Sequence, residues 1–577
     1  MTLEPFSQSL AEFIISTLMD KGIRQYFIAP GYRSSPLIQA LARSKVANTS
    51  VHVDERAIGF LALGFAKATK EIPAIIVTSG TALGNLMPAV MEAYHDNINM
   101  LIISADRPFE LHGIGANQTT YQENFFAPFT NTALNIPALS ASTPMRSIYT
   151  ALDNLLPPNL NGVAHLNIGF KKPFFKEDKN LSPSLTTPLH LKRNVQTQLG
   201  ESFLEKEQID TIFQLCSRYK KGIILVGQKD SAVDIYPLLT LSKILGWPLC
   251  IDILSPLAKY QNNREVISHF DLILSNGNNL SSLKIDAILQ IGHRFISSST
   301  LAFIGQSKPK LHAHITSSTP SMDLCHSFTH RYVCSANSAI KALASTAKNF
   351  PNSCDDTSYS ALWQTLDQRA ETLLTQNRME SSHGTLLQFF NKTAPSLKKG
   401  FALFIGNSLS IRAASKAFKR PRHLEHIFAN RGLSGIDGNI ATTIGIATGL
   451  QTPTIACIGD QTFLHDLSSL QMLKNCPYPI MFVVLDNQGG QIFSRLPIPL
   501  NEQDLNHFFI NSSPINYAHV AALFDMDYHP LNGFSSSIFE TTLSKHTLVV
   551  IEIDKTLDET EMLYLQDNIT LKKTASV

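Results

Sequence analysis

A strand, a helix and a second strand are predicted between residues 454 and 485, and this unit restricts the possible fold most. The first apolar run, 454–458, has the length of a strand. Apolar residues then recur at helical spacing up to Pro477, and 480–485 form a second strand-length run. Strands joined by a crossover helix run parallel, so their carboxyl ends lie at one edge of a sheet. The chain is therefore predicted to contain a parallel α/β sheet.

Polar oxygen donors follow both of these strands. Asp460 comes directly after the first strand and Asn487 after the second, with the flexible pair Gly489 and Gly490 next to it. A carboxylate, an amide oxygen and the Gly489 carbonyl are hard donors that suit Mg²⁺. We predict a metal site formed by Asp460, Asn487 and Gly489. The alternative is an ordinary strand-helix-strand unit whose loops carry these residues without a ligand.

Strand runs and helical patterns alternate in three stretches of the chain, and the length of 577 residues also predicts three domains. We predict an α/β protein with three doubly wound parallel-sheet domains, at 1–185, 195–350 and 380–577. A polar linker is expected at 171–197 and a helix around 362–374. The expected strands of the first two domains are 26–29, 51–53, 74–78, 100–104, 222–226, 249–251, 272–274 and 287–291.

Charge and cysteine usage limit the possible functions. The 48 Lys and Arg residues nearly balance the 46 Asp and Glu residues, which argues against nucleic acid as a partner. The amino terminus lacks the basic patch and apolar core of a secretory signal, and no apolar run reaches the ~20 residues of a membrane span. The 7 cysteines show no Cys-x-x-Cys spacing, so neither a zinc site nor a disulfide framework is predicted. These features favour small-molecule chemistry in the cytoplasm.

The strand-helix-strand unit resembles the thiamine diphosphate motif, which begins Gly-Asp-Gly and ends Asn-Asn. This chain has Gly459-Asp460-Gln461 and Asp486-Asn487, so it departs from the motif at two positions. Further blocks, among them PGYRSSPL, HVDERAIGFLALGFAK, ADRPFELHGIGANQTTYQ and NRGLSGIDG, together resemble the 2-succinyl-5-enolpyruvyl-6-hydroxy-3-cyclohexene-1-carboxylate synthase family. The matching blocks are 30–37, 52–67, 78–93, 105–122, 406–412, 430–438, 459–473 and 486–494.

The resemblance implies a thiamine diphosphate-binding fold and a transferase of menaquinone biosynthesis. The implied reaction is decarboxylation of 2-oxoglutarate followed by addition of the resulting succinyl carbanion to isochorismate. It also implies thiamine diphosphate with Mg²⁺ or Mn²⁺ as cofactors, and a homodimer or a dimer of dimers.

Glu55 is the candidate for the acid that thiamine diphosphate needs at its aminopyrimidine ring. It lies between a short strand run and an apolar helix, where a carboxyl group could hydrogen-bond the pyrimidine nitrogen. The alternative is that Asp54 and Glu55 only cap this helix. Ile436 is the candidate for the side chain that bends the cofactor, with a plain core position as its alternative.

The family blocks supply the remaining candidates. Gln118 is expected to act in catalysis and, with Asn117, to bind substrate, although both could simply end a Gly-rich loop. Ser408 is a candidate phosphate or substrate contact, with a helix cap as the alternative. Further expected cofactor contacts are Thr78, Gln491 and Ile492, and Phe493 is an expected substrate contact.

Four arginines lie in the matching blocks, at positions 33, 107, 412 and 431. Both implied substrates carry two carboxylates, which planar guanidinium groups bind in bidentate fashion better than lysine does. We therefore predict that Arg33, Arg107, Arg412 and Arg431 bind substrate. Any single arginine could instead be an ordinary surface residue.

The chain departs from the family in two places that concern the second substrate. Tyr32 replaces a serine beside Arg33, and Ser298 and Ser299 lie where the family offers basic residues. These departures leave two alternatives open: a related thiamine diphosphate carboligase or decarboxylase with another acceptor, and a catalytically silent paralogue. Retention of Glu55 and Asp460 argues against the second.

Overall fold

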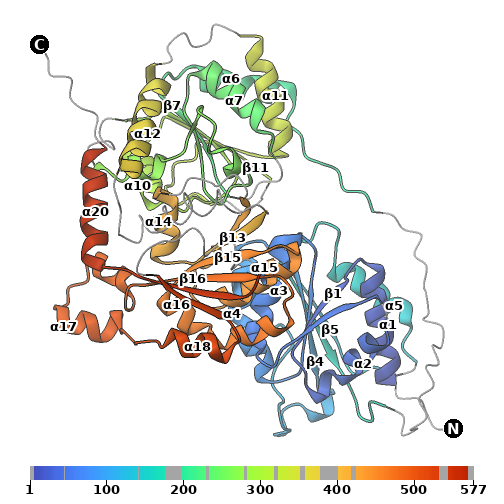
Figure 1. Ribbon diagram of the computed structural model, residues 1–577. Helices are drawn as coiled ribbons and strands as arrows, with labels where there is room; N and C mark the ends of the chain where they lie inside the picture. The colour runs from blue at the N-terminus through green and yellow to red at the C-terminus, as the bar shows by residue number, and fades with distance from the viewer. Residues whose placement is uncertain are drawn as a thin grey trace, which may run out of the picture.

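The structure, a computed structural model, contains three six-stranded parallel sheets with helices on their faces (Figure 1). It describes residues 6–44, 46–140, 142–175, 197–228, 233–277, 283–317, 322–350, 358–376, 400–417, 424–531 and 544–569. The predicted α/β class with three parallel sheets is thus confirmed. The domain boundaries stay a prediction, and most of the expected linker (176–196) lies outside the described residues.

The first sheet has the strand order β2-β1-β3-β4-β6-β5. Helices α1 (Phe6–Asp20), α2 (Ser35–Arg43) and α5 (Met145–Leu155) share one apolar core with it. Helices α3 (Glu55–Thr69) and α4 (Thr81–His95) belong to the core on its other face. The strands are β1 (Gln25–Ile28), β2 (Asn48–Val51), β3 (Ala74–Val77), β4 (Met100–Asp106), β5 (Thr132–Ile136) and β6 (Val163–Gly169).

The third sheet repeats this order as β14-β13-β15-β16-β18-β17. Helix α14 (Leu409–Ala417) packs on one face, and α15 (Asn439–Leu450) and α18 (Tyr517–Leu523) pack on the other. The predicted unit at 454–485 is confirmed as β15, a helical connection beginning with α16 (Asp460–His465), and β16. The strands are β13 (Phe401–Ile405), β14 (Leu424–Phe428), β15 (Thr454–Gly459), β16 (Ile480–Asp486), β17 (Asp527–Leu531) and β18 (Thr547–Glu552).

The middle sheet has a different order, β12-β11-β10-β7-β8-β9, which is the strand order of dinucleotide-binding folds. The strands predicted at 222–226, 249–251 and 287–291 match β7, β8 and β10. The strand expected at 272–274 is wrong, because these residues end the short helix α8 (Phe270–Leu274). The strands are β7 (Gly222–Val226), β8 (Leu249–Ile251), β9 (Val266–Ile267), β10 (Ala287–Ile291), β11 (Leu311–Thr316) and β12 (His330–Val333).

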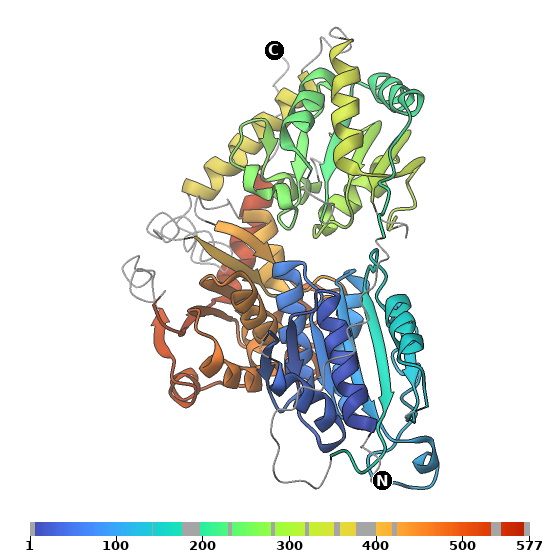
Figure 2. The ribbon, with the colours of Figure 1, turned by 90° about the vertical axis from the view of Figure 1, so that its right-hand side faces the viewer.

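Helices α3 and α15 join the first and third sheets through one shared apolar core. A Cβ atom on Gly64 would lie 2.1 Å from the Thr442 carbonyl oxygen, and one on Gly445 would lie 2.1 Å from the Leu61 carbonyl oxygen. Only glycine fits at these crossing points, so the two backbones touch. Figure 2 shows the two sheets beside each other, with the middle domain above them.

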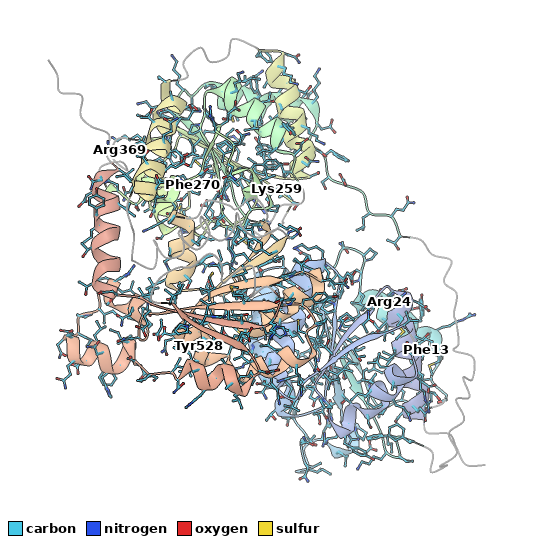
Figure 3. The ribbon with its side chains drawn as sticks, viewed as in Figure 1. Phe13, Arg24, Lys259, Phe270, Arg369 and Tyr528 are labelled. Carbon is cyan, nitrogen blue, oxygen red and sulfur yellow. The ribbon has the colours of Figure 1, made fainter. Side chains whose placement is uncertain are left out.

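Two further helices pack against the middle domain. The helix expected around 362–374 is confirmed as α12 (Ser358–Gln376), whose Trp363 is fully buried against Phe303. The carboxyl-terminal helix α20 (Lys555–Asn568) contacts α12, which ties the third domain to the middle one (Figure 3). Among the described residues, no helix has the length and apolar character needed to cross a membrane.

Candidate active site

The first-domain candidates follow four adjacent strands. Glu55 comes after β2, Arg33 after β1, Thr78 after β3 and Arg107 after β4. Because all four strands are parallel, these residues lie at the same carboxyl edge, where open α/β sheets bind ligands.

The third-domain candidates follow the equivalent four strands. Arg431 comes after β14, Ser408 after β13, Asp460 after β15 and Asn487 after β16. The two outer sheets therefore offer ligand-binding edges of the same topology. Contacts between the two domains come close to both edges: Arg56 Nη2 donates to the His465 carbonyl oxygen at 3.3 Å, and Ser468 Oγ donates to Asp54 Oδ2 at 3.4 Å.

The three predicted metal ligands meet in space. Asp460 is buried, and its Oδ2 accepts a hydrogen bond of 2.6 Å from the Gly489 N–H. One terminal atom of the Asn487 amide lies 2.9 Å from the Gly489 carbonyl oxygen and 3.3 Å from Asp460 Oδ1. An NH₂ group at that place donates to both oxygens, whereas the amide oxygen at that place completes a set of three oxygens that a cation would bind. The residues present therefore fit a divalent metal ion.

The loop that carries Asn487 depends on glycine. Gly489 has φ 116°, and a Cβ atom on it would lie 2.4 Å from the Ile510 carbonyl oxygen. That carbonyl accepts a 2.8 Å hydrogen bond from the Gly490 N–H, so 506–510 brace the loop from outside. Only glycine has both the conformation and the space at position 489.

The predicted cofactor contacts after Gly490 lie on the same loop. Gln491 is buried, and its Nε2 donates to the Gln488 carbonyl oxygen at 3.3 Å. Ile492 and Phe493 are half-buried, and the Phe493 ring packs against Phe509 with centroids 5.3 Å apart.

Burial raises the pKa of Asp460, although the hydrogen bond from the Gly489 N–H opposes this. The main cause is that the charged carboxylate loses water in its buried position. A bound cation would replace that lost solvation, so the electrostatics of the site also favour a metal ion.

Asp54, not Glu55, is the cap of helix α3. Asp54 Oδ1 accepts hydrogen bonds from the N–H groups of Arg56 (2.9 Å) and Ala57 (3.3 Å). Glu55 is half-buried and its Oε2 accepts a 3.2 Å hydrogen bond from Asn85 Nδ2 on α4. The capping alternative thus explains Asp54 and leaves the Glu55 carboxyl group available for another role.

Arg33 and Arg107 form a pair of buried cations at the first edge. Arg33 Nη1 donates to the Phe170 carbonyl oxygen at 2.7 Å, and Arg107 Nη1 donates to Ser79 Oγ. Burial and the neighbouring Arg107 lower the pKa of Arg33, while Asp106 opposes them. Two cations held together beside one carboxylate are suited to bind an anion.

The Phe174 ring contacts both Tyr32 and Arg33. The Tyr32 and Phe174 rings lie 5.1 Å apart, and the Arg33 guanidinium lies 5.0 Å from the Phe174 ring centroid. Tyr32, which replaces the family's serine, therefore packs its ring against Phe174, although 64% of the residue is exposed.

Arg412 and Arg431 form a second pair at the third edge. Arg412 is exposed, and its Nη1 donates to the Ser408 carbonyl oxygen at 2.7 Å. Arg431 Nη1 donates to Asn407 Oδ1 at 2.8 Å, whereas its buried Nε has no hydrogen-bond partner in the described structure. Burial and the nearby Arg412 lower the pKa of Arg431, while Asp252 opposes them. This pair, too, is suited to a carboxylate.

Ser408 directly precedes α14 with φ 66°.

Ile436 lies half-buried in the loop between β14 and α15. Asn407 Nδ2 fixes this loop by donating to the carbonyl oxygens of Asn430 (2.8 Å) and Gly435 (2.6 Å). Ile436 therefore lies in a hydrogen-bonded loop and not inside the sheet.

Asn117 and Gln118 lie exposed in the loop after β4. Gln118 has φ 53°, and its backbone lies against Gly80, at the turn that follows Thr78. The buried Gln122 fixes the same turn, because its Oε1 accepts a 3.1 Å hydrogen bond from the Gly80 N–H. The structure thus brings Gln118 and Thr78 to one corner of the first edge.

Arg294 is a basic residue of the middle domain that no sequence pattern indicated. Its Nη1 donates to the carbonyl oxygens of Arg431 (2.9 Å) and Gly432 (2.8 Å), and its Nη2 donates to that of His95 (3.2 Å). Ser298 and Ser299, in contrast, begin helix α10 (Ser298–Ser307). Arg294 was not recognised because no local pattern shows which distant loop a lone arginine contacts.

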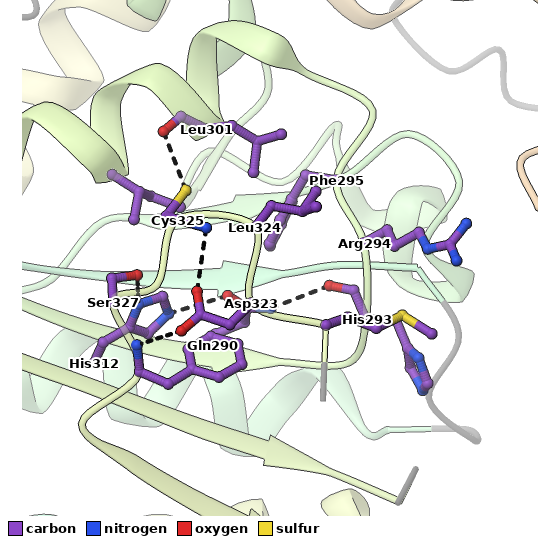
Figure 4. A pocket seen from close by; sticks show the side chains of 13 residues that line it. Gln290, His293, Arg294, Phe295, Leu301, His312, Asp323, Leu324, Cys325 and Ser327 are labelled. Carbon is purple, nitrogen blue, oxygen red and sulfur yellow. Dashed lines mark hydrogen bonds between the residues drawn. The ribbon is translucent and has the colours of Figure 1, made fainter. Parts of the chain in front are cut away.

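The middle domain has a separate pocket whose polar groups already bond to one another (Figure 4). His312 lies 3.1 Å from Gln290 Oε1 and 2.9 Å from Ser327 Oγ, and burial lowers its pKa to about 4. His312, Gln290 and Ser327 therefore form a structural polar network. Arg294 also lines this pocket, and its guanidinium reaches the backbone of residues 431 and 432. In the part of the chain that the structure describes, His, Cys, Asp and Glu side chains form no group of three that could hold a metal ion.

Comparison with known proteins defines the class. Residues 8–127 match the thiamine pyrophosphate enzyme N-terminal TPP-binding domain, 192–405 the middle domain, and 405–553 the C-terminal TPP-binding domain. An X-ray structure of a protein from Mycobacterium smegmatis, assigned to the thiamin diphosphate-dependent enzymes, superposes with a TM-score of 0.65. It covers 94% of this chain and 98% of its own at 15% identity, which shows a common fold. The three sheets are those of a thiamine pyrophosphate enzyme.

Curated relatives define the family within this class. The chain is 30% identical to a protein of Shewanella frigidimarina over 94% of both chains, and 30% identical to one of Proteus mirabilis over 96% of both. It is 31% identical to one of Aliivibrio fischeri, over 91% of this chain and 90% of the relative. All three relatives are named 2-succinyl-5-enolpyruvyl-6-hydroxy-3-cyclohexene-1-carboxylate synthase. This chain belongs to that synthase family, which confirms the resemblance seen in the sequence.

Proposed function

We propose that this protein uses thiamine diphosphate to decarboxylate 2-oxoglutarate and to add the resulting succinyl unit to isochorismate. The product would be 2-succinyl-5-enolpyruvyl-6-hydroxy-3-cyclohexene-1-carboxylate, with CO₂, in menaquinone biosynthesis. The observation that carries the proposal is the presence of two arginine pairs, one at each candidate edge, in a chain of this family. Both substrates are dicarboxylates, and each pair offers two guanidinium groups.

Asp460, Asn487 and the Gly489 carbonyl would hold Mg²⁺ or Mn²⁺, and the metal would hold the diphosphate of the cofactor. Thiamine diphosphate, when bound, supplies a thiazolium carbon that attacks 2-oxo acids and accepts the electrons left by CO₂. Thr78, Ser408, Gln491 and Ile492 are the further proposed cofactor contacts, and Ile436 would set the bend of the cofactor.

Glu55 would keep a proton at the pyrimidine nitrogen, since its carboxyl group lies half-buried at the first edge, where the Asn85 amide donates to it. Gln118 would take part in proton transfer, directly or through water. Asn117, Gln118 and Phe493 would contact the substrates beside the four arginines.

The finer properties follow from the family and the composition. We propose a homodimer or a dimer of dimers in the cytoplasm, with small molecules and not nucleic acid as partners. A carboligase with another acceptor is the reading that the experiment must exclude.

The experiment follows isochorismate consumption and CO₂ release by purified protein with 2-oxoglutarate, thiamine diphosphate and Mg²⁺. We expect isochorismate to be consumed only when 2-oxoglutarate is present. The matched control omits isochorismate and supplies chorismate, its ring isomer. CO₂ release without any loss of isochorismate would reject the proposal and indicate a different acceptor.

A further inference from the structure

Two charged side chains are buried where the first domain meets the third. Lys67 on α3 and Glu92 on α4 are only 4% and 3% exposed. Lys67 Nζ lies 3.5 Å from Glu92 Oε1 and 3.0 Å from Asp96 Oδ2. A buried ion pair is often no more stabilising than apolar residues of similar volume, so stability alone does not explain this pair.

Both side chains bond to the backbone of one loop in the third domain. Glu92 Oε1 accepts from the Gly432 N–H at 2.8 Å, and Glu92 Oε2 accepts from the Leu433 N–H at 2.7 Å. Lys67 Nζ donates to the Ala429 carbonyl oxygen at 2.8 Å. Hydrogen bonds to charged partners are the strong ones among protein hydrogen bonds, so these contacts fix the backbone on both sides of Arg431.

The loop has little freedom left. A Cβ atom on Gly432 would lie 2.3 Å from the Glu92 carbonyl oxygen, so the loop backbone touches α4. Arg294 holds the carbonyl oxygens of Arg431 and Gly432 from the side of the middle domain. The segment 429–433 is therefore held by charged side chains of two other domains.

We propose that Lys67 and Glu92 are positioning residues that hold the 429–433 loop so that the Arg431 guanidinium meets a substrate carboxylate. The pair acts through the backbone and does not itself touch substrate. The inference rests on the proposed function in one respect, namely that Arg431 binds substrate. That the pair orders the loop is a separate claim, which can be measured without any turnover.

The first test is hydrogen-deuterium exchange of the peptide that contains 429–433 in the cofactor-loaded protein. Glu92→Gln leaves one loop N–H facing an NH₂ group, so exchange there should rise about tenfold. Asp153→Asn is the control, because it breaks the ion pair of Asp153 on α5 with Lys21, and α5 packs on the face of the first sheet opposite to α3 and α4. The control should leave this peptide unchanged. Unchanged exchange in Glu92→Gln would overturn the proposal. If that variant does not fold, Glu92→Asp keeps the charge but withdraws the carboxylate and is judged in the same way.

The second test separates positioning from a general loss of structure. Glu92→Gln should raise KM for one substrate about tenfold with much less effect on kcat. In an Arg431→Lys background the same change should have little further effect, because both act on one guanidinium contact. Fully additive effects, or faster loop exchange with unchanged KM, would overturn the proposal. A wild-type protein that does not turn over the substrates would instead reject the proposed function, while the exchange experiment would still decide whether the pair orders the loop.

Discussion

Glu55 begins helix α3 but does not cap it, and this separation from Asp54 makes its role testable. Glu55→Gln should fold and bind cofactor, yet lose activity by about 10²- to 10⁴-fold, the usual contribution of a positioned acid or base. The direct readout is proton exchange at the thiazolium carbon, followed by NMR. Asp54→Asn is the matched control, because asparagine also caps helices and should preserve the exchange rate. An exchange rate in Glu55→Gln equal to that of the wild type would contradict the assignment.

As a proposed metal ligand, Asp460 should make metal binding depend on pH. Burial raises its pKa, and a proton on the carboxylate competes with the metal ion. Metal affinity should therefore fall as the pH drops, starting at a higher pH than an exposed aspartate would give. In the metal-free protein the same raised pKa means that stability is lost as the pH rises through that value, so the metal should stabilise the fold more at high pH.

Titration calorimetry with Mg²⁺ and thiamine diphosphate at several pH values measures this dependence. Asp460→Ala should abolish binding at every pH. Asp486→Asn, which restores the residue of the general motif, should retain it. The asparagine oxygen can accept from the Gln488 N–H, which now lies 2.9 Å from Asp486 Oδ1, and its NH₂ group can donate to the Tyr517 hydroxyl, now 3.1 Å from Oδ2. Binding by Asp460→Ala as tight as that of the wild type would show that the metal lies elsewhere.

At the scale of elements, the loop after β16 carries two of the three proposed metal ligands, Asn487 and Gly489, and Gly489 is its least replaceable residue. Gly489→Ala meets both an unfavourable φ of 116° and a carbonyl oxygen at 2.4 Å, so it should cost about 1–3 kcal/mol in free energy of unfolding and weaken cofactor binding. Gly84→Ala is the control, because nothing lies within 4 Å of its Cβ position on α4, and alanine should be neutral or stabilising there. Thermal unfolding of both variants provides the comparison. Equal melting temperatures would disprove the required close approach.

Sequence patterns predicted some, but not all, of the buried strands. Residues 222–226 and 287–291 match their strands because both faces of a parallel sheet are buried. The strand predicted at 272–274 is wrong because a short apolar run fits a buried helix equally well. The edge strands β5 and β17 were missed, since their apolar pattern is weak or broken by Pro530. The buried strands β6, β11, β13 and β18 were not predicted either, and the strand expected at 51–53 overlaps β2 only at Val51.

The sequence predicted those site residues that lie in local motifs or in the family blocks. Asp460, Asn487 and Gly489 were found because strand ends fix their position relative to one another. Lys67 and Glu92 were not found, because a bond between residues 340 positions apart, such as that of Glu92 with Gly432, leaves no periodic signal in the chain. Arg294 was missed for the same reason.

At the scale of the whole molecule, an active site could combine the Glu55 edge and the Asp460 edge of one chain or of two different chains. The loop after β4 exposes Phe109 and Tyr121, each 84% exposed, beside Asn117 and Gln118. We propose that a second copy of the chain covers this edge and supplies the Asp460 edge to it.

Mixing Glu55→Gln and Asp460→Ala proteins under subunit-exchange conditions tests this proposal. A shared site should recover part of the activity, because one site of the mixed dimer carries both intact residues. No recovery, despite demonstrated heterodimers and added cofactor, would mean that each chain completes its own site.

The stoichiometry of the complete reaction tests the proposed two-substrate activity most directly. Purified protein is incubated with isotopically labelled 2-oxoglutarate, isochorismate, thiamine diphosphate and Mg²⁺, and the products are identified by mass spectrometry. We expect one CO₂ for each molecule of the succinylated cyclohexene product, with the label of the remaining four carbons in that product, and a loss of both in Glu55→Gln. Release of CO₂ with the label in any other compound, or a product that forms equally well with Glu55→Gln, would contradict it.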